Sequence, residues 1–541
     1  MRKNESYRLS VTGTTSEGQG VARRDGWVIF IQGAIAGELV QAKILKVKKN
    51  IAYAKTEKIF APSPSRICPP CSVFPQCGGC CYLHVAYEKQ LELKRQKVSD
   101  CLKRIGKIEF PVSETLPSPQ PFHYRNKVFI PVGKDADGKL TAGFYAPRSH
   151  RIQSAGDCMI QDKRAQEVIR RILQWMEEFQ ISPYDEKSHT GMIRHIYFRT
   201  GLSGGQVMAG VIANAERLPH ADFLASRLLE TDGVVSVIHN VNCAKTNVIL
   251  GDQTKIIAGT PYIEDQILGT SFRIGPRSFY QVNPYQTPRL YRTALDAMHL
   301  NEEDVLFDIY CGIGTIGLCA AKRVKKLIGI EIIPEAIAYA KQNAEINGIR
   351  NAAFFAGKAE EKIFELMERG ETPTAAVLDP PRSGCDRKLL DAIIRMAPEK
   401  LCYISCDPAT LARDLKELTE HSDYQIKSVV PVDMFPQTSH VETVCQLVLR
   451  KPAVHINIDV DVEELVQDKR GAATYGQIKD YVLEHSGLKV SSLYIAQVKQ
   501  KYGIIERENY NKTKSENVKQ PQCPPEKEKA ITEALKHFGM I

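Results

Sequence analysis

The chain has 541 residues, which is too long for one hydrophobic core and predicts about three or four domains. With 43% hydrophobic and 25% charged residues its composition is that of a globular protein, and no run approaches the roughly 20 apolar residues of a membrane span. The net charge of +9 permits an anionic partner, and the first residues lack the apolar stretch of a signal peptide. We therefore expect a cytoplasmic protein with no membrane partner.

Residues 1–62, the expected first domain, alternate short β-rich runs with glycine turns. The runs predict five strands, at 7–11, 18–22, 27–31, 38–47 and 51–59. Five short strands in such a span are typical of a small barrel of the oligonucleotide-binding type. Residues 1–60 hold eleven Lys or Arg against five Asp or Glu, a balance that favours binding to nucleic acid.

Residues 63–290 are expected to form a β-rich central domain. A helix at 85–104 with a basic outer face comes first, and β-rich segments at 122–160 and 192–280 flank a helix near 161–180. Five of the fifteen cysteines lie at its start, at positions 68, 71, 77, 80 and 81. In a reducing compartment, clustered cysteines are more often metal ligands or catalytic groups than disulfides. From spacing alone, the two pairs Cys68/Cys71 and Cys77/Cys80 suit a tetrahedral zinc ion.

Strands and helices alternate in residues 291–452, which predicts an α/β domain with a doubly wound, Rossmann-like sheet. The apolar runs that predict its strands lie at 305–309, 326–331, 352–356, 374–378, 401–405 and 445–449. Residues 453–541 are a C-terminal extension. It contains a helix–turn–helix-like unit at 475–503 and a polar, charged stretch at 506–529 that we expect to be a flexible linker.

A glycine-rich turn with Gly312 and Gly314 follows the first of these strands and opens a helix. Such glycines let the backbone approach a ligand closely at the helix N-terminus. Glu331 ends the next strand, about twenty residues later, where a carboxylate can accept both hydroxyls of a ribose. The pattern indicates a nucleotide-type ligand. NAD is one candidate, but Asp308-x-x-Cys-Gly-x-Gly is closer to the first motif of S-adenosylmethionine (SAM) methyltransferases.

Cys406 ends an apolar run and is followed by Asp407 and Pro408. The run predicts a buried strand, and Asp-Pro supplies the N-cap and the first-turn proline of a helix. Backbone N–H groups and the positive end of the helix dipole at that junction favour a thiolate, the nucleophilic form. Cys406 is therefore a candidate nucleophile for covalent catalysis. The local sequence leaves a buried structural cysteine open as the alternative.

Four motifs resemble, in order and interval, the RNA (uracil-5-)-methyltransferase family, over residues 5–450. They are Asp308-x-Tyr-Cys-Gly-x-Gly, Leu-Asp379-Pro-Pro-Arg-Ser-Gly, Ser-Cys406-Asp-Pro-Ala-Thr-Leu and His440-Val-Glu-Thr-Val. The resemblance implies that Cys406 is the nucleophile and that Glu442 removes the proton from carbon 5 of uracil. It implies that Asp379 contacts either the uracil or one end of SAM.

The resemblance also implies the binding residues. Those expected to bind SAM are Gln281, Tyr310, Gly312, Gly314, Glu331 and Asp379. An aromatic ring at the position of Phe279 is expected near the target base. One departure from the family is Asp407, where many relatives have Asn; both are good N-caps, but Asp places a charge near the thiol.

The cysteines resemble those of the ribosomal-RNA branch of this family, which bind a [4Fe–4S] cluster through C-x5-C-G-G-C and a distant fourth cysteine. The ligands implied here are Cys71, Cys77, Cys80 and Cys158, with Cys68 and Cys81 outside the set. Thiolates suit such a cluster chemically, and we expect it to be structural. The basic barrel resembles a TRAM domain, an RNA-binding module at this position in the same branch.

The implied function is SAM-dependent methylation of carbon 5 of a uridine in 23S ribosomal RNA, by a monomer whose partner is RNA and not DNA. Carbon 5 is too weak a nucleophile unaided, so thiolate addition at carbon 6 must first convert the ring to an enolate. A thiolate cannot reach carbon 6 in a stacked helix, so the base is expected to flip out.

Three alternatives belong beside this interpretation. A transfer-RNA uracil-5-methyltransferase shares the chemistry, although the shorter transfer-RNA enzymes typically lack the barrel and the cluster. A non-catalytic RNA-binding or assembly factor would use the barrel and cluster and would not need Cys406. A dinucleotide oxidoreductase with an iron–sulfur centre would bind NAD at Gly312 and Gly314.

Overall fold

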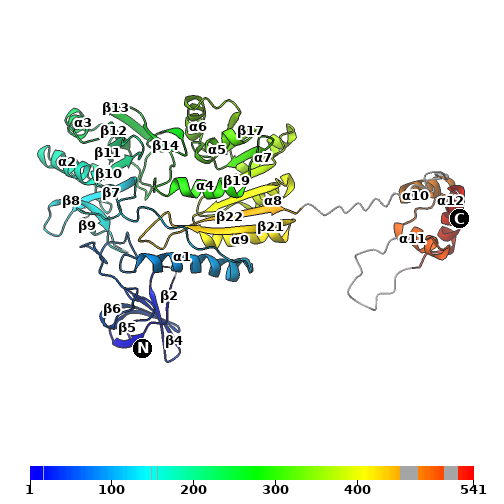
Figure 1. Cartoon of the computed structure of the whole chain (residues 1–541), viewed down its shortest axis with the longest axis horizontal. Coiled ribbons are helices and arrows are strands. Elements are labelled where there is room, and N and C mark those ends of the chain that lie inside the picture. Colours follow the sequence, from blue (N-terminus) through cyan, green and yellow to red (C-terminus); the bar gives the residue numbers. More distant parts are fainter. Residues whose placement is uncertain (16, 148, 155, 451–472, 505–521) are drawn as a thin grey trace. The chain divides into compact units, whose positions relative to one another are not determined.

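The computed structural model describes residues 1–15, 17–147, 149–154, 156–450, 473–504 and 522–541. The chain forms two compact units, Met1–Pro452 and Ala453–Ile541. The colours of Figure 1 follow the residue numbers, so each unit can be found from the bar. No helix in the described ranges is long and apolar enough to span a membrane. The domain boundaries predicted after residues 62 and 290 fall within the first unit and stay a prediction.

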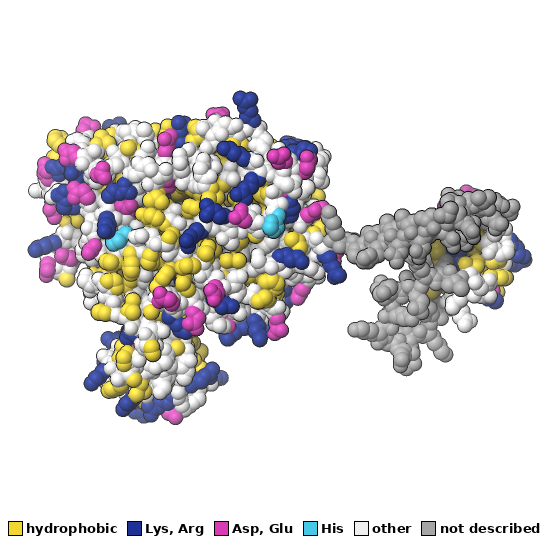
Figure 2. Space-filling view, in the orientation of Figure 1, with side chains coloured by type: hydrophobic (Ala, Val, Ile, Leu, Met, Phe, Trp, Pro, Cys, Tyr) yellow, Lys and Arg dark blue, Asp and Glu magenta, His cyan; other side chains and the backbone are white. Residues whose placement is uncertain are grey.

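The N-terminal barrel is a six-stranded sheet in the order β1-β5-β6-β4-β3-β2. Its strands are β1 (Ser6–Ser10), β2 (Gly13–Thr14), β3 (Gly20–Arg24), β4 (Trp27–Gln32), β5 (Leu39–Lys48) and β6 (Ile51–Ala61). Alternate residues of β5, Val40, Ala42 and Ile44, pack into the barrel core, as the two-residue period of a strand requires. On the face shown in Figure 2, Lys and Arg predominate among the charged side chains of this barrel. The predicted barrel is confirmed, with β2 as a short addition.

A second sheet forms the middle of the first unit, in the order β13-β12-β11-β10-β7-β8-β9. Its strands are β7 (Lys127–Lys134), β8 (Leu140–Tyr145), β9 (Ile152–Ser154), β10 (Ile193–Thr200), β11 (Val207–Ala213), β12 (Val234–Val241) and β13 (Gln253–Gly259). Helices α2 (Arg164–Glu178) and α3 (Ala221–Leu229) pack against this sheet, and a hairpin of β14 (Ile263–Ile267) and β15 (Thr270–Ile274) follows. The helix predicted near 161–180 is confirmed as α2. The sequence prediction missed α3, which forms the crossover that parallel pairing of β11 with β12 requires.

The third sheet has the order β18-β17-β16-β19-β20-β22-β21. Its strands are β16 (Val305–Ile309), β17 (Lys326–Glu331), β18 (Ala352–Ala356), β19 (Ala375–Leu378), β20 (Lys400–Ser405), β21 (Tyr424–Val432) and β22 (Glu442–Leu449). The strands β16 to β20 pair in parallel, while β22 runs antiparallel between β20 and β21. The predicted doubly wound α/β sheet is confirmed.

Strand β21 was not predicted, because Lys427 and Pro431 interrupt its apolar pattern. It lies at the edge of the sheet, and among the strands of the described residues only β22 pairs with it. Residues 113–116 run along its outer side, where Leu116 N donates to Pro431 O at 2.8 Å. Proline is tolerated at such an edge, since no further strand of the sheet depends on the missing N–H. The position of the strand, which the sequence alone does not reveal, therefore explains its composition.

Helices cover both faces of the third sheet. Those on one face are α4 (Thr287–Ala297), α5 (Thr315–Ala320) and α6 (Pro334–Ile346), and those on the other are α7 (Ala359–Glu368), α8 (Arg387–Met396) and α9 (Pro408–Glu420). Neighbouring residues of β16 show the alternation, since Leu306 packs with the first set and Phe307 with the second. The helix predicted at 85–104 is confirmed as α1 (Tyr87–Cys101), which continues as a π-helical turn (Leu102–Gly106) and lies beside α9 (Figure 1).

The second unit contains three helices among its described residues: α10 (Tyr475–Ser486), α11 (Ser492–Lys501) and α12 (Pro525–His537). The first two confirm the helix–turn–helix-like unit predicted at 475–503. Most of the linker predicted at 506–529 lies outside the described residues, but its last part is wrong, because it belongs to α12. The polar stretch of α12 leads into a buried stripe that includes Ile531 and Leu535 and packs against the other two helices.

The segment 433–440, which joins β21 to β22, is held in place by α1. Lys94 and Asp433 form an ion pair with both side chains fully buried, and the Tyr87 hydroxyl donates to Asp433 Oδ2 at 2.8 Å. Gln90 Nε2 donates to Gln437 Oε1 at 2.9 Å, and Gln437 N donates to Gln90 Oε1 at 3.0 Å. Other donors to this segment are Lys94 Nζ to Phe435 O, Tyr82 N to Gln437 O, Lys97 Nζ to Ser439 O and Tyr124 Oη to Pro436 O. The backbone that leads into β22 is thereby fixed.

We expect Lys94→Met to lower the free energy of unfolding by about 3–5 kcal/mol, because Asp433 is then buried without a counter-charge. Combining it with Asp433→Asn should recover most of the loss, since the neutral amide can still accept the Tyr87 hydroxyl. Urea unfolding followed by circular dichroism measures both variants. Equal losses in the single and the double variant would show that the ion pair is not the source of the effect.

Candidate active site

One edge of the third sheet collects the side chains that the sequence singles out. Asp308 lies near the carboxyl end of β16, Asp379 follows β19, and Cys406 follows β20. Parallel strands present their carboxyl ends at the same edge, so these residues meet there. Antiparallel pairing places Thr443 opposite Ser405, so Glu442, the first residue of β22, lies beside Cys406. The fold thus brings the predicted nucleophile and the predicted base together.

The glycine turn has the backbone that a ligand cradle needs. Tyr310, Gly312 and Gly314 have φ angles of 69°, 55° and 83°, in the left-handed region. Gly314 is also the N-cap of α5, and a Cβ added at Gly312 would meet nothing within 4 Å. The turn therefore leaves open space over the end of β16, and only Tyr310 adopts this conformation there without being glycine.

Glu331 lies beside this turn, at the end of β17. Its Oε2 accepts from Gly312 N at 3.2 Å and its Oε1 accepts from Ile333 N at 3.0 Å. Ile332 and Ile333 follow it with 56% and 52% of their surface exposed, which is unusual for large apolar side chains. Carboxylate, glycine turn and exposed apolar surface together fit an adenosine, with the ribose at Glu331. The sequence reasoning missed the two isoleucines, whose only signal was their position after Glu331.

Three carboxyl groups at this edge are buried. Burial, and then the charge of Glu331, raises the pKa of Asp308 to about 7; its Oδ2 accepts from Gly317 N at 2.8 Å and its Oδ1 has no partner. Burial, and then the charge of Asp308, raises the pKa of Asp379 to about 7. Burial and then Asp379 raise the pKa of Glu442 well above its usual value, and Glu442 Oε2 also lacks a partner. Unpartnered buried carboxyl oxygens are costly, and they point to a ligand that supplies the missing donors.

Cys406 is half-buried at the start of α9. Asp407 Oδ1 accepts from Ala409 N at 2.8 Å and from Thr410 N at 3.4 Å, and Pro408 begins the helix, so the predicted N-cap is confirmed. The prediction of a thiolate is wrong for the free protein. Burial, and then the charges of Glu442 and Asp379, raises the pKa of the Cys406 thiol to about 11. The helix terminus is visible in the local sequence, but those carboxylates come from distant positions.

Arg382 is a cation near this site that the sequence reasoning passed over. Its charge opposes the rise in pKa of both Cys406 and Glu442. It directly follows Asp379-Pro380-Pro381, so a cation after this motif was the available signal.

The segment before α4 carries Phe279 and Gln281, and the second sheet holds it. Arg199 donates to Gly275 O and to Ser278 O, both at 2.7 Å, and Asn126 Nδ2 donates to Gln281 O at 3.0 Å. The Gln281 side chain is buried, whereas the Phe279 ring is 62% exposed. A large ring held outward on a fixed backbone is available to a ligand, but the roles predicted for both residues stay predictions.

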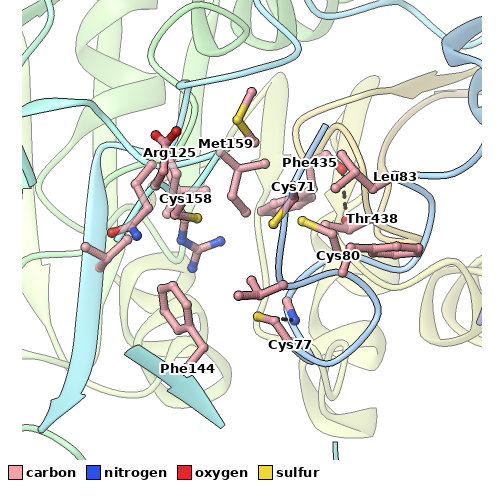
Figure 3. Close-up of a pocket in the computed structure, with 18 of the residues that line it drawn as sticks. Cys71, Cys77, Cys80, Leu83, Arg125, Phe144, Cys158, Met159, Phe435 and Thr438 are labelled. Carbon is pink, nitrogen blue, oxygen red and sulfur yellow. Dashed lines mark hydrogen bonds between the residues drawn. The ribbon is translucent and has the colours of Figure 1, made fainter. Parts of the chain in front are cut away.

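A cavity of about 820 Å³ joins the cysteine-rich segment to this edge of the sheet. Its wall includes Cys71, Cys77, Cys80 and Cys158, which Figure 3 shows around one open space, and also Arg382 and His440. Cys68 is exposed and Cys81 does not line the cavity. Among these four cysteines, Cys80 has the pKa that is raised furthest. Burial is the largest cause, and negative charge on the other three sulfur atoms adds to it. Among the described residues no group of three or more His, Cys, Asp or Glu could hold a metal ion, so neither the zinc nor the cluster prediction is confirmed.

The glycine turn and the acidic strand end of this doubly wound sheet suit a nucleotide-type ligand and have the pattern expected of a SAM-dependent methyltransferase. The chain belongs to the tRNA (uracil-5-)-methyltransferase family, whose family model matches residues 86–451, and a TRAM domain matches residues 2–56. It is therefore an RNA methyltransferase with SAM as its cofactor and RNA as its partner, which excludes the NAD alternative.

The chain is 46% identical to an uncharacterised RNA methyltransferase of Clostridium tetani over 82% of this chain and 96% of the relative. A similar protein of Listeria monocytogenes is 45% identical over 83% and 98%. The solved structure of Pyrococcus abyssi tRNA (uracil-54, C5)-methyltransferase in complex with S-adenosyl-L-homocysteine is 29% identical, with a TM-score of 0.65 over 82% of this chain and 100% of that chain. A transfer-RNA enzyme thus matches along its full length, so chain length does not separate transfer RNA from ribosomal RNA as substrate.

The raised pKa of Cys406 predicts how the thiol reacts in the free protein. Alkylation of Cys406 by iodoacetamide should accelerate about tenfold per pH unit from pH 7 to 10 without a plateau, because the thiolate fraction rises until about pH 11. Asp379→Asn should make the reaction several-fold faster at a given pH, since one of the opposing charges is gone. Mass spectrometry of the Cys406 peptide measures both rates. A plateau in the alkylation rate near pH 8 would contradict the raised pKa of the Cys406 thiol.

Proposed function

We propose that the protein methylates carbon 5 of a uridine in 23S ribosomal RNA through a covalent adduct between Cys406 and carbon 6. The observation that carries the proposal is the meeting of Cys406 with Glu442 across β20 and β22, beside Asp379 and the glycine turn. A thiol and a carboxyl group in this arrangement suit addition to a ring and later removal of a ring proton. The glycine turn and Glu331, on the other side of the site, suit an adenosine.

The chemistry divides between these side chains. Cys406 loses its proton to water and its sulfur bonds to carbon 6, which makes carbon 5 nucleophilic. SAM would supply the electrophilic methyl group to carbon 5, with the bond between that methyl group and the SAM sulfur breaking and S-adenosylhomocysteine leaving. Glu442 then takes the proton from carbon 5, and the bond between carbon 6 and the Cys406 sulfur breaks as the ring double bond returns. The raised pKa of Glu442 strengthens it as a base once it is ionised.

The remaining predicted residues bind and orient. Gly312, Gly314 and Tyr310 would hold SAM on the turn, with Glu331 at the ribose and Gln281 as a further contact. Asp379 would accept a hydrogen bond from the uracil or from SAM, and the exposed ring of Phe279 would stack near the flipped base.

Two variants test the roles of the catalytic residues. Cys406→Ala should abolish formation of 5-methyluridine and leave SAM binding nearly intact, because Cys406 lies on the uracil side of the site. Glu442→Gln should trap a covalent protein–RNA adduct, because the proton on carbon 5 then has no base to accept it. Mass spectrometry of digested RNA and a denaturing gel measure the two results. Methylation by Cys406→Ala would remove Cys406 from the mechanism.

The ribosomal target is supported by the cysteine pattern and by the basic barrel. A transfer-RNA target is the second candidate, because the matching solved structure is a tRNA (uracil-54, C5)-methyltransferase. Mapping 5-methyluridine in ribosomal and transfer RNA of a deletion strain decides between them. A non-catalytic assembly role would leave both maps unchanged. We also propose that the protein acts as a cytoplasmic monomer.

We propose that Cys71, Cys77, Cys80 and Cys158 hold a [4Fe–4S] cluster. Four thiols around one cavity suit a soft, polynuclear centre, and Cys68, which the zinc alternative needs, is exposed apart from it. The cluster would tie the segment around Cys77 to Cys158 and would take no part in methyl transfer.

Protein purified without oxygen should therefore be brown and contain iron and acid-labile sulfide, because four thiolates at this spacing favour iron–sulfur ligation. Cys158→Ser should lower the iron content, while Cys68→Ser serves as the matched control and should leave it unchanged. Elemental analysis and the visible spectrum measure the outcome. A colourless, zinc-loaded protein would contradict the proposal.

A further inference from the structure

A second cavity, of about 880 Å³, lies at the far end of the second sheet; we name it the distal pocket. Its wall includes Lys134 at the end of β7, whereas Lys127 at the start of β7 lines the cysteine cavity. The two lysines are seven positions apart on the strand, roughly 23 Å at about 3.3 Å per residue. Neither Cys406 nor Glu442 lines the distal pocket, which is therefore a site apart from the one where the target nucleotide reacts.

One rim of the distal pocket is built around Arg194, at the start of β10. Its buried guanidinium donates to Asn242 O at 3.0 Å and to Ala244 O and Thr246 O at 2.8 Å. The same group stacks over the Tyr184 ring at 4.6 Å. These hydrogen bonds from Arg194 hold the loop around residues 242–246 in a shape that keeps Lys245 exposed.

The opposite rim is held by Asp185, whose Oδ1 accepts from Lys187 N at 3.0 Å and from Ser188 N at 2.7 Å. The Tyr184 hydroxyl lies 2.9 Å from His189 Nδ1. These bonds close a tight loop and leave the Lys187 side chain exposed at the pocket. Both rims are therefore ordered by their own internal bonds rather than by a ligand.

The acidic side chains of the distal pocket have partners, whereas several of its cations form no ion pair. Glu186 Oε2 lies 2.6 Å from His150 Nδ1 and its Oε1 accepts the Tyr145 hydroxyl at 3.2 Å, and Asp185 is engaged by its own loop. Four exposed cations line the same cavity and form no ion pair with a carboxylate of the described chain: Lys134, Arg151, Lys187 and Lys245. The pocket therefore presents positive charge that its own acids do not neutralise.

We infer that the distal pocket binds the phosphates of substrate RNA outside the target nucleotide. Lysine ammonium groups around a preformed hollow suit a polyanion, and the partner of this enzyme is RNA. Strands β7 and β8 line both the cysteine cavity and the distal pocket, so an RNA strand that extends beyond the active site along them would reach these cations. The inference rests on the proposed function only for the place where the RNA enters.

The test compares two triple variants of the full-length protein. The pocket variant is Lys134→Gln/Lys187→Gln/Lys245→Gln, and the control is Lys139→Gln/Lys322→Gln/Lys341→Gln, which removes three exposed lysines that line no described cavity. Binding of a 23S ribosomal RNA transcript is followed by fluorescence anisotropy without SAM, at several salt concentrations. The pocket variant should raise Kd on the order of tenfold and lower the slope of log Kd against log salt by about 2, and the control should do neither.

Methylation gives an independent readout. The pocket variant should raise KM for the long transcript, leave kcat unchanged, and methylate a short oligouridylate as well as the natural chain does. Equal effects of both triple variants on RNA binding would overturn the inference. Loss of binding to polyglutamate but not to RNA would also overturn it, because the pocket would then serve an acidic protein. If the natural chain methylated no RNA, the proposed function would fail, while the anisotropy comparison would still decide the role of the pocket.

Discussion

Burial of acidic groups where β16, β19 and β20 end and β22 begins is the constraint on which the rest of this molecule depends. Asp308, Asp379, Glu442 and the Cys406 thiol all have raised pKa values, and in each case burial is the largest cause. In the free protein, burial therefore favours the neutral form of each of these groups over the charged form. Their ionisation depends on partners that bring donors and positive charge, which couples reactivity to a filled site.

The parts around this edge act as supports for it. Arg199 fixes the backbone before Phe279 and Asn126 fixes the backbone after it, and α1 fixes the segment that leads to Glu442. The cysteine-rich segment meets the same edge through one shared cavity. Groups that must align within a fraction of an ångström are thus set on backbone that several elements hold at once.

Much of this architecture could be predicted from the sequence, for physical reasons. Strands β16, β17, β19 and β20 lie inside the sheet and read as nearly continuous apolar runs, and β18 is a short apolar run at its edge, so the positions of all five were predicted almost to the residue. Edge strand β21 carries Pro431 and lacks that signal. The N-cap at Asp407 is local and was predicted, whereas the pKa of Cys406 depends on Asp379 and Glu442, which only the sheet order brings near. Cys406, Glu442 and Asp379, whose roles came from family resemblance, lie together at one edge of the third sheet, and these roles stay predictions.

Helix α1 also limits how this enzyme can be divided into separate parts. It lies far upstream of the third sheet in sequence, yet it packs beside α9 and holds the segment 433–440. A catalytic half excised at residue 291 would leave the carbonyl groups of that segment without donors from Lys94, Lys97 and Tyr124. Recombination that exchanged the SAM-binding half alone would therefore separate Glu442 from the helix that fixes the segment before it. The two halves depend on each other for the position of that side chain, so they can be exchanged only together.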